Sequence, residues 1–320
     1  MHNISLLNND EAMKLFCKLS PQGNRPKEDY ERLSKEVVSY VGGLPLALSV
    51  LGPFLCDKDI DEWKSALARL KDIPNDDIVG KLKLSFDGLT KVEKELFLDI
   101  ACFFRWENKE KSMEILDACG FHPVIGVKVL IQKALITISK DGEFDMHDLV
   151  QEMGHHIVRG EHPNNPEKHT RVWKEEDAIT ICSMDATTEL DMIEAVGLRF
   201  FVFPLEDKLP LVANGKNLRW IQWQCDIAIH LLSNFPQRTL CCLILGRGLQ
   251  KQLWEGNKFL PNLKIIELWS FHNLIVTPDF CGLPNLERFI LTRCFYLEEI
   301  HPSIGRLERL VFLRIAHCPP

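Results

Sequence analysis

The chain has 320 residues, of which 46% are hydrophobic and 26% charged, so it is long enough to form two or three compact units. Its formal net charge of −7 gives no reason to expect a nucleic-acid partner, because proteins that bind the phosphate backbone usually present a basic face. Eleven cysteines without a C-x-x-C pair argue against a disulfide framework and a zinc site. With no apolar run long enough to cross a bilayer, we expect a cytoplasmic protein, with the nucleus as the alternative, and no membrane partner.

Residues 1–72 are predicted to form a small helical bundle. Apolar residues recur at helical spacing in two successive segments, 8–19 and 30–41. A glycine pair then breaks the chain, and Pro45 suits the first turn of a new helix because its missing N–H has no partner to lose there. Segment 46–55 is apolar on nearly every side, so we expect it to be buried.

Residues 73–185 are predicted to form a winged helix, in which three helices are followed by a β-hairpin. Capping residues, glycines and apolar periodicity mark the ends of these segments. The expected segments are a helix that begins at the capping box Thr90–Glu93, helices 109–119 and 123–134, and strands 135–139 and 143–146.

Winged helices also occur in DNA-binding regulators, whose third helix enters the major groove. Here the third helix carries a series of branched aliphatic residues and only two cations, Lys128 and Lys133. That composition favours packing against protein over the reading of bases. A DNA-binding function is therefore disfavoured.

His147 and Asp148 stand where the second hairpin strand gives way to the next helix. The first backbone N–H groups of a helix lack intrahelical partners and carry partial positive charge. This position favours an anion, either the Asp148 carboxylate or a bound phosphate. Ordinary helix capping would also account for the pair, so the position alone leaves both interpretations open.

The last part of the chain, residues 186–320, is repetitive. Its leucines recur every 22 to 24 residues, and each begins the pattern L-x-x-L-x-L or a close variant. This period is typical of leucine-rich repeats, each of which adds one strand to a curved parallel sheet. The repeats begin at Leu218, Leu240, Leu263, Leu286 and Leu310, with an irregular first strand expected from Leu198, Phe201 and Phe203. Cys294 and Cys318 occupy the buried Asn/Cys position of their repeats.

Several histidines fall in a polar stretch within the predicted winged-helix region. His155, His156, His162 and His169 lack the spacing of an H-E-x-x-H motif. This favours solvated side chains over a metal site, so we expect no bound metal.

Four segments, in their order along the chain, resemble motifs of plant disease-resistance receptors of the nucleotide-binding, leucine-rich-repeat class. Residues 40–48, which contain Gly-Leu-Pro-Leu, and residues 84–89 and 96–104 are similar to three successive family motifs, and Met146–Asp148 resembles the Met-His-Asp motif. The third segment is similar to the subfamily with an N-terminal TIR domain. The chain is thus identified as a member of the TIR-NB-ARC-LRR family, and we expect a fragment without the TIR domain and the P-loop.

The resemblance implies a mainly helical fold with α/β repeats. It assigns residues 1–72 to a helical ARC subdomain, residues 73–185 to a winged-helix domain with the Met-His-Asp motif, and residues 186–320 to about five leucine-rich repeats with an incomplete C-terminus.

A binding site for ADP or ATP is also implied. The cofactor-binding positions would be Pro45, Leu46, His147 and Asp148, with Pro45 against the adenine, His147 near the β-phosphate and Asp148 fixing the start of its helix. No G-x-x-x-x-G-K-[ST] loop occurs in the sequence. We therefore expect the nucleotide to bind weakly or not at all, and we expect neither catalytic residues nor ATP hydrolysis.

The implied function is ADP-dependent conformational switching in plant innate immunity. The repeats would hold the off state through intramolecular contacts and would bind a protein, either a pathogen effector or a guarded host protein. The alternative is an inert, decoy or adaptor fragment that acts only through protein–protein interaction. Upstream sequence that encodes a TIR domain and a P-loop in frame would favour the receptor.

Overall fold

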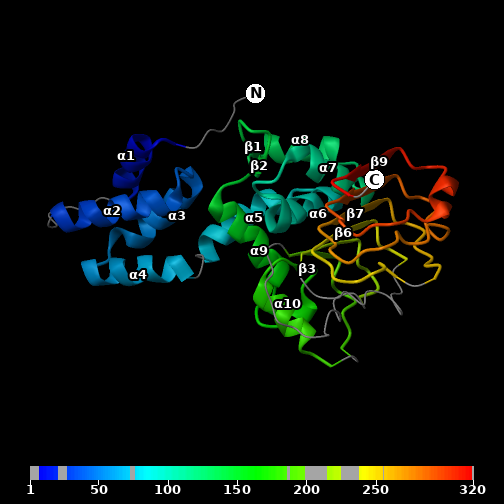
Figure 1. Ribbon diagram of the computed structural model, residues 1–320. Helices are drawn as coiled ribbons and strands as arrows, with labels where there is room; N and C mark the ends of the chain where they lie inside the picture. Colours follow the sequence, from blue (N-terminus) through cyan, green and yellow to red (C-terminus); the bar gives the residue numbers. More distant parts are fainter. Residues whose placement is uncertain are drawn as a thin grey trace. The chain divides into compact units, whose positions relative to one another are not determined.

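The computed structural model describes residues 7–20, 27–72, 76–185, 188–198, 215–224, 238–254 and 256–318 (Figure 1). The chain packs as two compact units, one made of Met1–Lys109 and Val124–Ile157 and the other of Glu110–Pro123 and Val158–Pro320. The first unit is helical with a small hairpin, and the second contains a parallel sheet. The predicted fold class is confirmed, whereas the three-part domain division stays a prediction.

Four of the described helices form the expected bundle at the start of the chain. They are α1 (Asn9–Leu19), α2 (Lys27–Val41), α3 (Pro45–Cys56) and α4 (Ile60–Asp72). The rings of Phe16 and Tyr30 meet Trp63 edge to face, with centroid distances of 5.9 and 5.4 Å. The buried indole nitrogen of Trp63 donates to the Leu55 carbonyl at 2.8 Å, so this large side chain is packed without a lost hydrogen bond.

Helix α3 begins at Pro45, as the sequence predicts. Its burial is less complete than expected. Leu48, Leu51 and Leu55 are fully buried, but Phe54 is 42% exposed and lies under the ammonium group of Lys58. A bundle of this size covers only part of the helix, so an all-apolar sequence does not become buried on every side.

The winged-helix elements follow in the predicted order. After α5 (Asp76–Asp87) they are α6 (Lys91–Asp99), α7 (Lys109–Ala118), α8 (Pro123–Gln132), the strands β1 (Thr137–Ile138) and β2 (Phe144–Asp145), and α9 (Asp148–Arg159). The capping box between Thr90 and Glu93 is present. The strands are antiparallel and shorter than predicted, since only two residue pairs are in register.

One feature of this region was not predicted. Helix α6 continues directly into a π-helix, η1 (Ile100–Phe104), in which the Arg105 N–H donates to the Ile100 carbonyl five residues back. Such wide turns are rare and often occur at functional sites. The Trp106 N–H then turns away and donates to the Phe144 carbonyl at 2.6 Å, which ties the end of η1 to the hairpin.

Among the described residues of the second unit, seven parallel strands are hydrogen-bonded in chain order. They are β3 (Arg171–Val172), β4 (Ala195–Leu198), β5 (Trp220–Gln224), β6 (Cys242–Gly246), β7 (Ile265–Trp269), β8 (Arg288–Thr292) and β9 (Phe312–Ala316). The last five are the predicted repeats. Leu198 ends β4, while Phe201 and Phe203 lie outside the described residues. Strand β3 was not predicted. The short helices η2 (Pro166–Lys168), α10 (Glu175–Cys182) and η4 (Pro302–Arg306) complete the unit.

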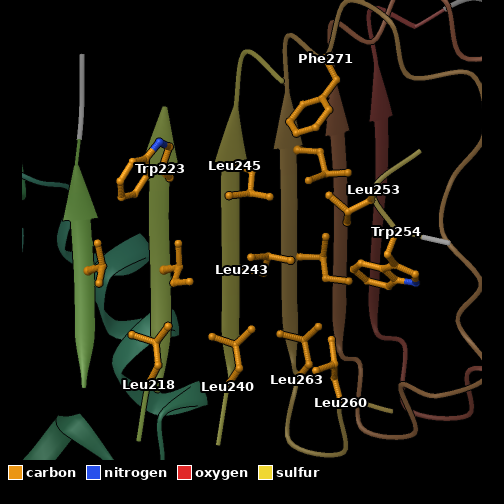
Figure 2. Packing of buried hydrophobic residues seen from close by; sticks show 14 of the residues in the cluster. Leu218, Trp223, Leu240, Leu243, Leu245, Leu253, Trp254, Leu260, Leu263 and Phe271 are labelled. Carbon is orange, nitrogen blue, oxygen red and sulfur yellow. The ribbon is translucent and has the colours of Figure 1, made fainter. Parts of the chain in front are cut away.

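Buried leucines form rows that cross the strands of this sheet. Figure 2 shows Leu218, Leu240 and Leu263 in one row on neighbouring repeats, and all three are fully buried. Strand pairing aligns the rows, because Leu243 stands opposite Ile221 on one side and Ile266 on the other. Each repeat therefore relies on its neighbours for burial of its apolar residues.

The opposite face of the sheet is contacted by the segment that follows Lys109. The ammonium group of Lys111 lies 3.0 Å from the Glu267 carboxylate, and Glu114 lies 3.3 Å from the Arg288 guanidinium. Beyond the end of α7, the ring of Phe121 lies under the Arg219 guanidinium at 4.6 Å. These contacts explain how charged side chains are accommodated on the inner strands of the repeats.

The reactivity of the Cys294 thiol is a test of the packing of the repeats. Its side chain is fully buried, as predicted, and burial raises the pKa of Cys294 to about 11. Only the thiolate reacts with alkylating reagents, so we predict that Cys294 is labelled slowly near neutral pH and faster as the pH increases toward that value. Cys281 is exposed in the preceding repeat and should react rapidly. Mass spectrometry after a short iodoacetamide pulse measures both. Equal labelling of the two cysteines in the folded protein would contradict the packing.

Candidate functional site

His147 caps the helix that follows the hairpin. Its Nδ1 atom accepts a hydrogen bond from the Leu149 N–H at 3.1 Å, and its carbonyl accepts from Val150 and Gln151. The imidazole, rather than a carboxylate, thus satisfies the orphan donor at the start of α9. Because Nδ1 is an acceptor, the proton of a neutral ring resides on Nε2, which faces away from the helix as a donor.

The Nε2 atom of His147 lies against the glycine pair that precedes α3. A Cβ on Gly42 would come within 2.7 Å of this nitrogen. Gly42 and Gly43 have φ values of +59° and +79°, a conformation that other residues adopt only with strain. The Gly43 carbonyl also accepts from the Leu7 N–H at 2.9 Å. The fold therefore brings the Gly-Leu-Pro-Leu segment and the Met-His-Asp segment together within the first unit.

Tyr40, two residues before Gly42, is also influenced by a residue of α9. Burial raises the pKa of the Tyr40 phenol, and the negative charge of Glu152 on α9 adds to the effect. Glu152 lies on α9, five residues after His147, so a second residue of this region acts on the C-terminal end of α2.

Pro45 and Leu46 form the first turn of α3, three and four residues after Gly42, and both are half-buried. The N-cap residue, Leu44, supplies no side-chain acceptor to the helix. Pro45 has no N–H, so the donors here are the backbone N–H groups of Leu46 and Ala47 and the imidazole Nε2–H, while the side chains of Pro45 and Leu46 are apolar. This combination suits an anionic group attached to a flat apolar one, as in a nucleotide, and supplies no acid–base pair.

Asp148 is the first residue of α9, but its carboxylate is directed to a side-chain partner rather than to the helix end. It lies 2.6 Å from the Arg105 guanidinium, which also contacts Asp145 at 3.2 Å. Arg105 was missed in the sequence. The available signal was a single cation that directly follows the apolar run ending at Phe104.

Two of the four histidines in the polar stretch are buried, so the expectation that all are solvated is wrong. His155 donates to the Ala101 carbonyl at 3.2 Å, and the His169 ring bonds to the His162 carbonyl at 2.8 Å. Only His156 and His162 are exposed. Backbone acceptors allow an imidazole to be buried without a metal. Throughout the described part of the chain, no three side chains of metal-binding type come together.

None of the helices that the structure describes is both long enough and apolar enough to span a bilayer.

Comparison with known proteins identifies the class to which this fold and site belong. Residues 90–162 match the family described as the winged-helix domain of Roq1-like disease-resistance proteins. Over 97% of its length the chain is 37% identical to disease resistance protein RUN1 of Vitis rotundifolia, and over 99% it is 34% identical to TMV resistance protein N of Nicotiana glutinosa. Similarity extends to disease resistance protein RRS1 of Arabidopsis thaliana, with 30% identity over 99% of the chain.

The chain is thus similar, over nearly its whole length, to the class of plant disease-resistance proteins, and it carries a winged helix and leucine-rich repeats. Within that class, it belongs to the family of TMV resistance protein N. The chain spans less than a third of the length of these relatives, 27% of RUN1 and 29% of N.

We predict different consequences for alanine at the two glycines. Both changes place an L-residue at positive φ, which costs about 1–3 kcal/mol. In Gly43→Ala the new Cβ would stand 2.2 Å from the Leu7 carbonyl oxygen, a backbone atom, so the loss of stability should be larger. In Gly42→Ala the Cβ meets the His147 ring, so the imidazole should shift instead.

Denaturant unfolding and the NMR resonances of the His147 ring measure the two effects. Gly142→Ala is the matched control, since Gly142 also has positive φ, +77°, but a Cβ there meets nothing within 4 Å. If Gly42→Ala leaves the His147 resonances as they are in Gly142→Ala, the proposed contact does not exist.

Proposed function

We propose that this chain is the switch and sensing region of an intracellular plant immune receptor, and that bound ADP stabilises its off state. The observation that carries the proposal is the placement of the His147 Nε2 atom beside Gly42, next to the turn that starts α3. Two segments far apart in sequence thereby form one donor-rich position in a protein of the disease-resistance family.

The residues of this chain would hold the nucleotide by complementary chemistry. ADP supplies a diphosphate and a flat purine. The Nε2–H of His147 would donate to a phosphate oxygen, and the first amides of α3 would favour the same negative charge. Pro45 and Leu46 would offer apolar surface to the purine. Because His147 also caps α9, nucleotide binding would fix the start of that helix.

The role we propose is binding and signalling rather than catalysis. Phosphoryl transfer needs a charge clamp and a metal site, and no G-x-x-x-x-G-K-[ST] loop occurs in these 320 residues. We therefore infer weak binding of ADP to this chain. The repeats would serve protein recognition, with a pathogen effector or a guarded host protein as the partner, and the receptor would act in the cytoplasm. A repeat solenoid suits this task because it presents a long continuous surface.

We predict that ADP binds the chain with a Kd on the order of 1 mM and shifts the His147 ring resonances in an NMR titration. Because one hydrogen bond to a charged group contributes about 1.5–3 kcal/mol, His147→Ala should weaken binding roughly tenfold or more. His156→Ala, an exposed histidine on the same helix, should change nothing. Adenosine, which lacks phosphates, should leave the His147 resonances in place. ADP affinity that survives His147→Ala would rule out the proposed site.

A DNA-binding role would require a different surface on the third helix of the winged helix, α8, from the apolar one that the structure shows. Val124 and Ile125, near the start of α8, are 72% and 74% exposed, and Ile131 is 41% exposed. An apolar surface cannot release counterions from phosphates, so we predict no sequence-specific binding and only weak non-specific binding to DNA. Fluorescence anisotropy with labelled duplexes at physiological salt tests this. Submicromolar binding that depends on the DNA sequence would favour the DNA-binding function over the immune-receptor function.

A further inference from the structure

Arg105 is bound to both acidic residues that flank the Met146–His147 pair. Its Nε lies 3.2 Å from the Asp145 carboxylate, and an Nη lies 2.6 Å from the Asp148 carboxylate. The other Nη donates to the Gln151 side chain one turn further along α9. The guanidinium also lies 4.3 Å from the ring of Trp106, and the Arg105 side chain is only 11% exposed. One cation is thus fixed against the last residue of β2 and the first turn of α9.

The π-helix η1 explains why Arg105 is in this place. Its wide turn ends at Arg105, and Trp106, with φ of +62°, leaves the helix to bond with the hairpin. The Ala101 carbonyl of η1 then accepts from the Gln151 side chain at 2.9 Å and from His155 at 3.2 Å. Helix α9 is therefore anchored to η1 along two turns, and Arg105 lies at the end nearest His147.

We propose that Arg105 is the positioning residue that sets the orientation of the His147 ring, by holding Asp145 and Asp148 on either side of it. The inference deepens the proposed nucleotide site, on which its functional meaning rests. The Asp145 carboxylate also accepts from the Met146 N–H at 2.8 Å, so the contact fixes the backbone of the segment as well as its side chains.

The geometry requires arginine rather than any cation. The Asp148 side chain is 79% exposed, and an isolated ion pair at such a position contributes little. A guanidinium has five N–H donors in a planar fork, so it can hold Asp145, Asp148 and Gln151 together while it stacks on an aromatic ring. A lysine ammonium group would keep the charge but could not meet the same acceptors in one plane.

The test measures the His147 ring in the full chain without nucleotide, using long-range proton–nitrogen NMR of histidine-labelled protein at about pH 8, where an ordinary imidazole is neutral. In the unaltered chain the Nε2–H tautomer should dominate, since Nδ1 accepts from Leu149. In Arg105→Gln we expect a mixture of tautomers and roughly tenfold faster hydrogen exchange of the Leu149 amide. Arg105→Lys should show a smaller change. Arg32→Gln, which removes an exposed ion pair with Glu36 on α2, is the control and should show none.

A purely structural role would lower the melting temperature of Arg105→Gln and leave the His147 signals of the folded protein unchanged, which overturns the proposal. If Arg105→Gln does not fold, the variants Asp145→Asn and Asp148→Asn each remove one anchor. Each should then shift the His147 tautomer partway, and no shift in either one would also overturn the proposal. Since ADP is absent from the measurement, this result is separate from the nucleotide titration, and either proposal can fail without the other.

Discussion

The close approach of the His147 ring to the α-carbon of Gly42 is the contact on which the first unit's candidate site depends. It requires a residue without a Cβ at position 42, and the positive φ there favours the same residue independently. It also requires an imidazole whose Nδ1 atom is already occupied by the Leu149 N–H, so that Nε2 is left as the donor. The α2–α3 turn and the start of α9 are consequently matched to each other. A change on either side alters the position of the His147 side chain, which contacts both segments.

The second unit depends on a different constraint. Its leucine rows are buried only because neighbouring repeats stand in register, and the Asn262 and Asn285 side chains donate to the carbonyls of Arg238 and Pro261 in the preceding repeats. Stability in such an array is close to a sum of contacts between neighbours. The first unit has an apolar core of its own, and polar contacts between segments distant in sequence form its candidate site. These two kinds of packing agree with the tasks proposed for the units, a switch in the first and a continuous protein-binding surface in the second.

Features governed by local patterns were predictable from the sequence. The capping box at Thr90, the helix start at Pro45 and the repeat strands are each determined by a few neighbouring residues or by a regular period. His147 was identified as a candidate for the same reason, because it lies at a recognisable strand-to-helix junction. Local patterns could not predict its proximity to Gly42, because the two residues are separated by more than a hundred positions; only the family resemblance implied a common site for their two segments.

The features that were missed all depend on contacts made only in the folded chain. Nothing in the apolar run before Arg105 specifies a π-turn, and the role of Arg105 appears only once the hairpin brings Asp145 to it. His155 is buried because the Ala101 carbonyl of η1 is available to it, which composition cannot show. Strand β3 is too short to have a pattern and is defined by its pairing with β4.

The most direct test of the account is whether Gly42 and His147 touch in solution. A nuclear Overhauser measurement on the 320-residue chain, with glycine and histidine selectively labelled, would detect the α-protons of Gly42 next to the ring protons of His147. We expect a strong cross-peak, because the ring carbons Cε1 and Cδ2 lie 3.4 and 3.6 Å from the site that a Cβ on Gly42 would take. Folded protein without that cross-peak would contradict the central claim that the two motif segments form one site.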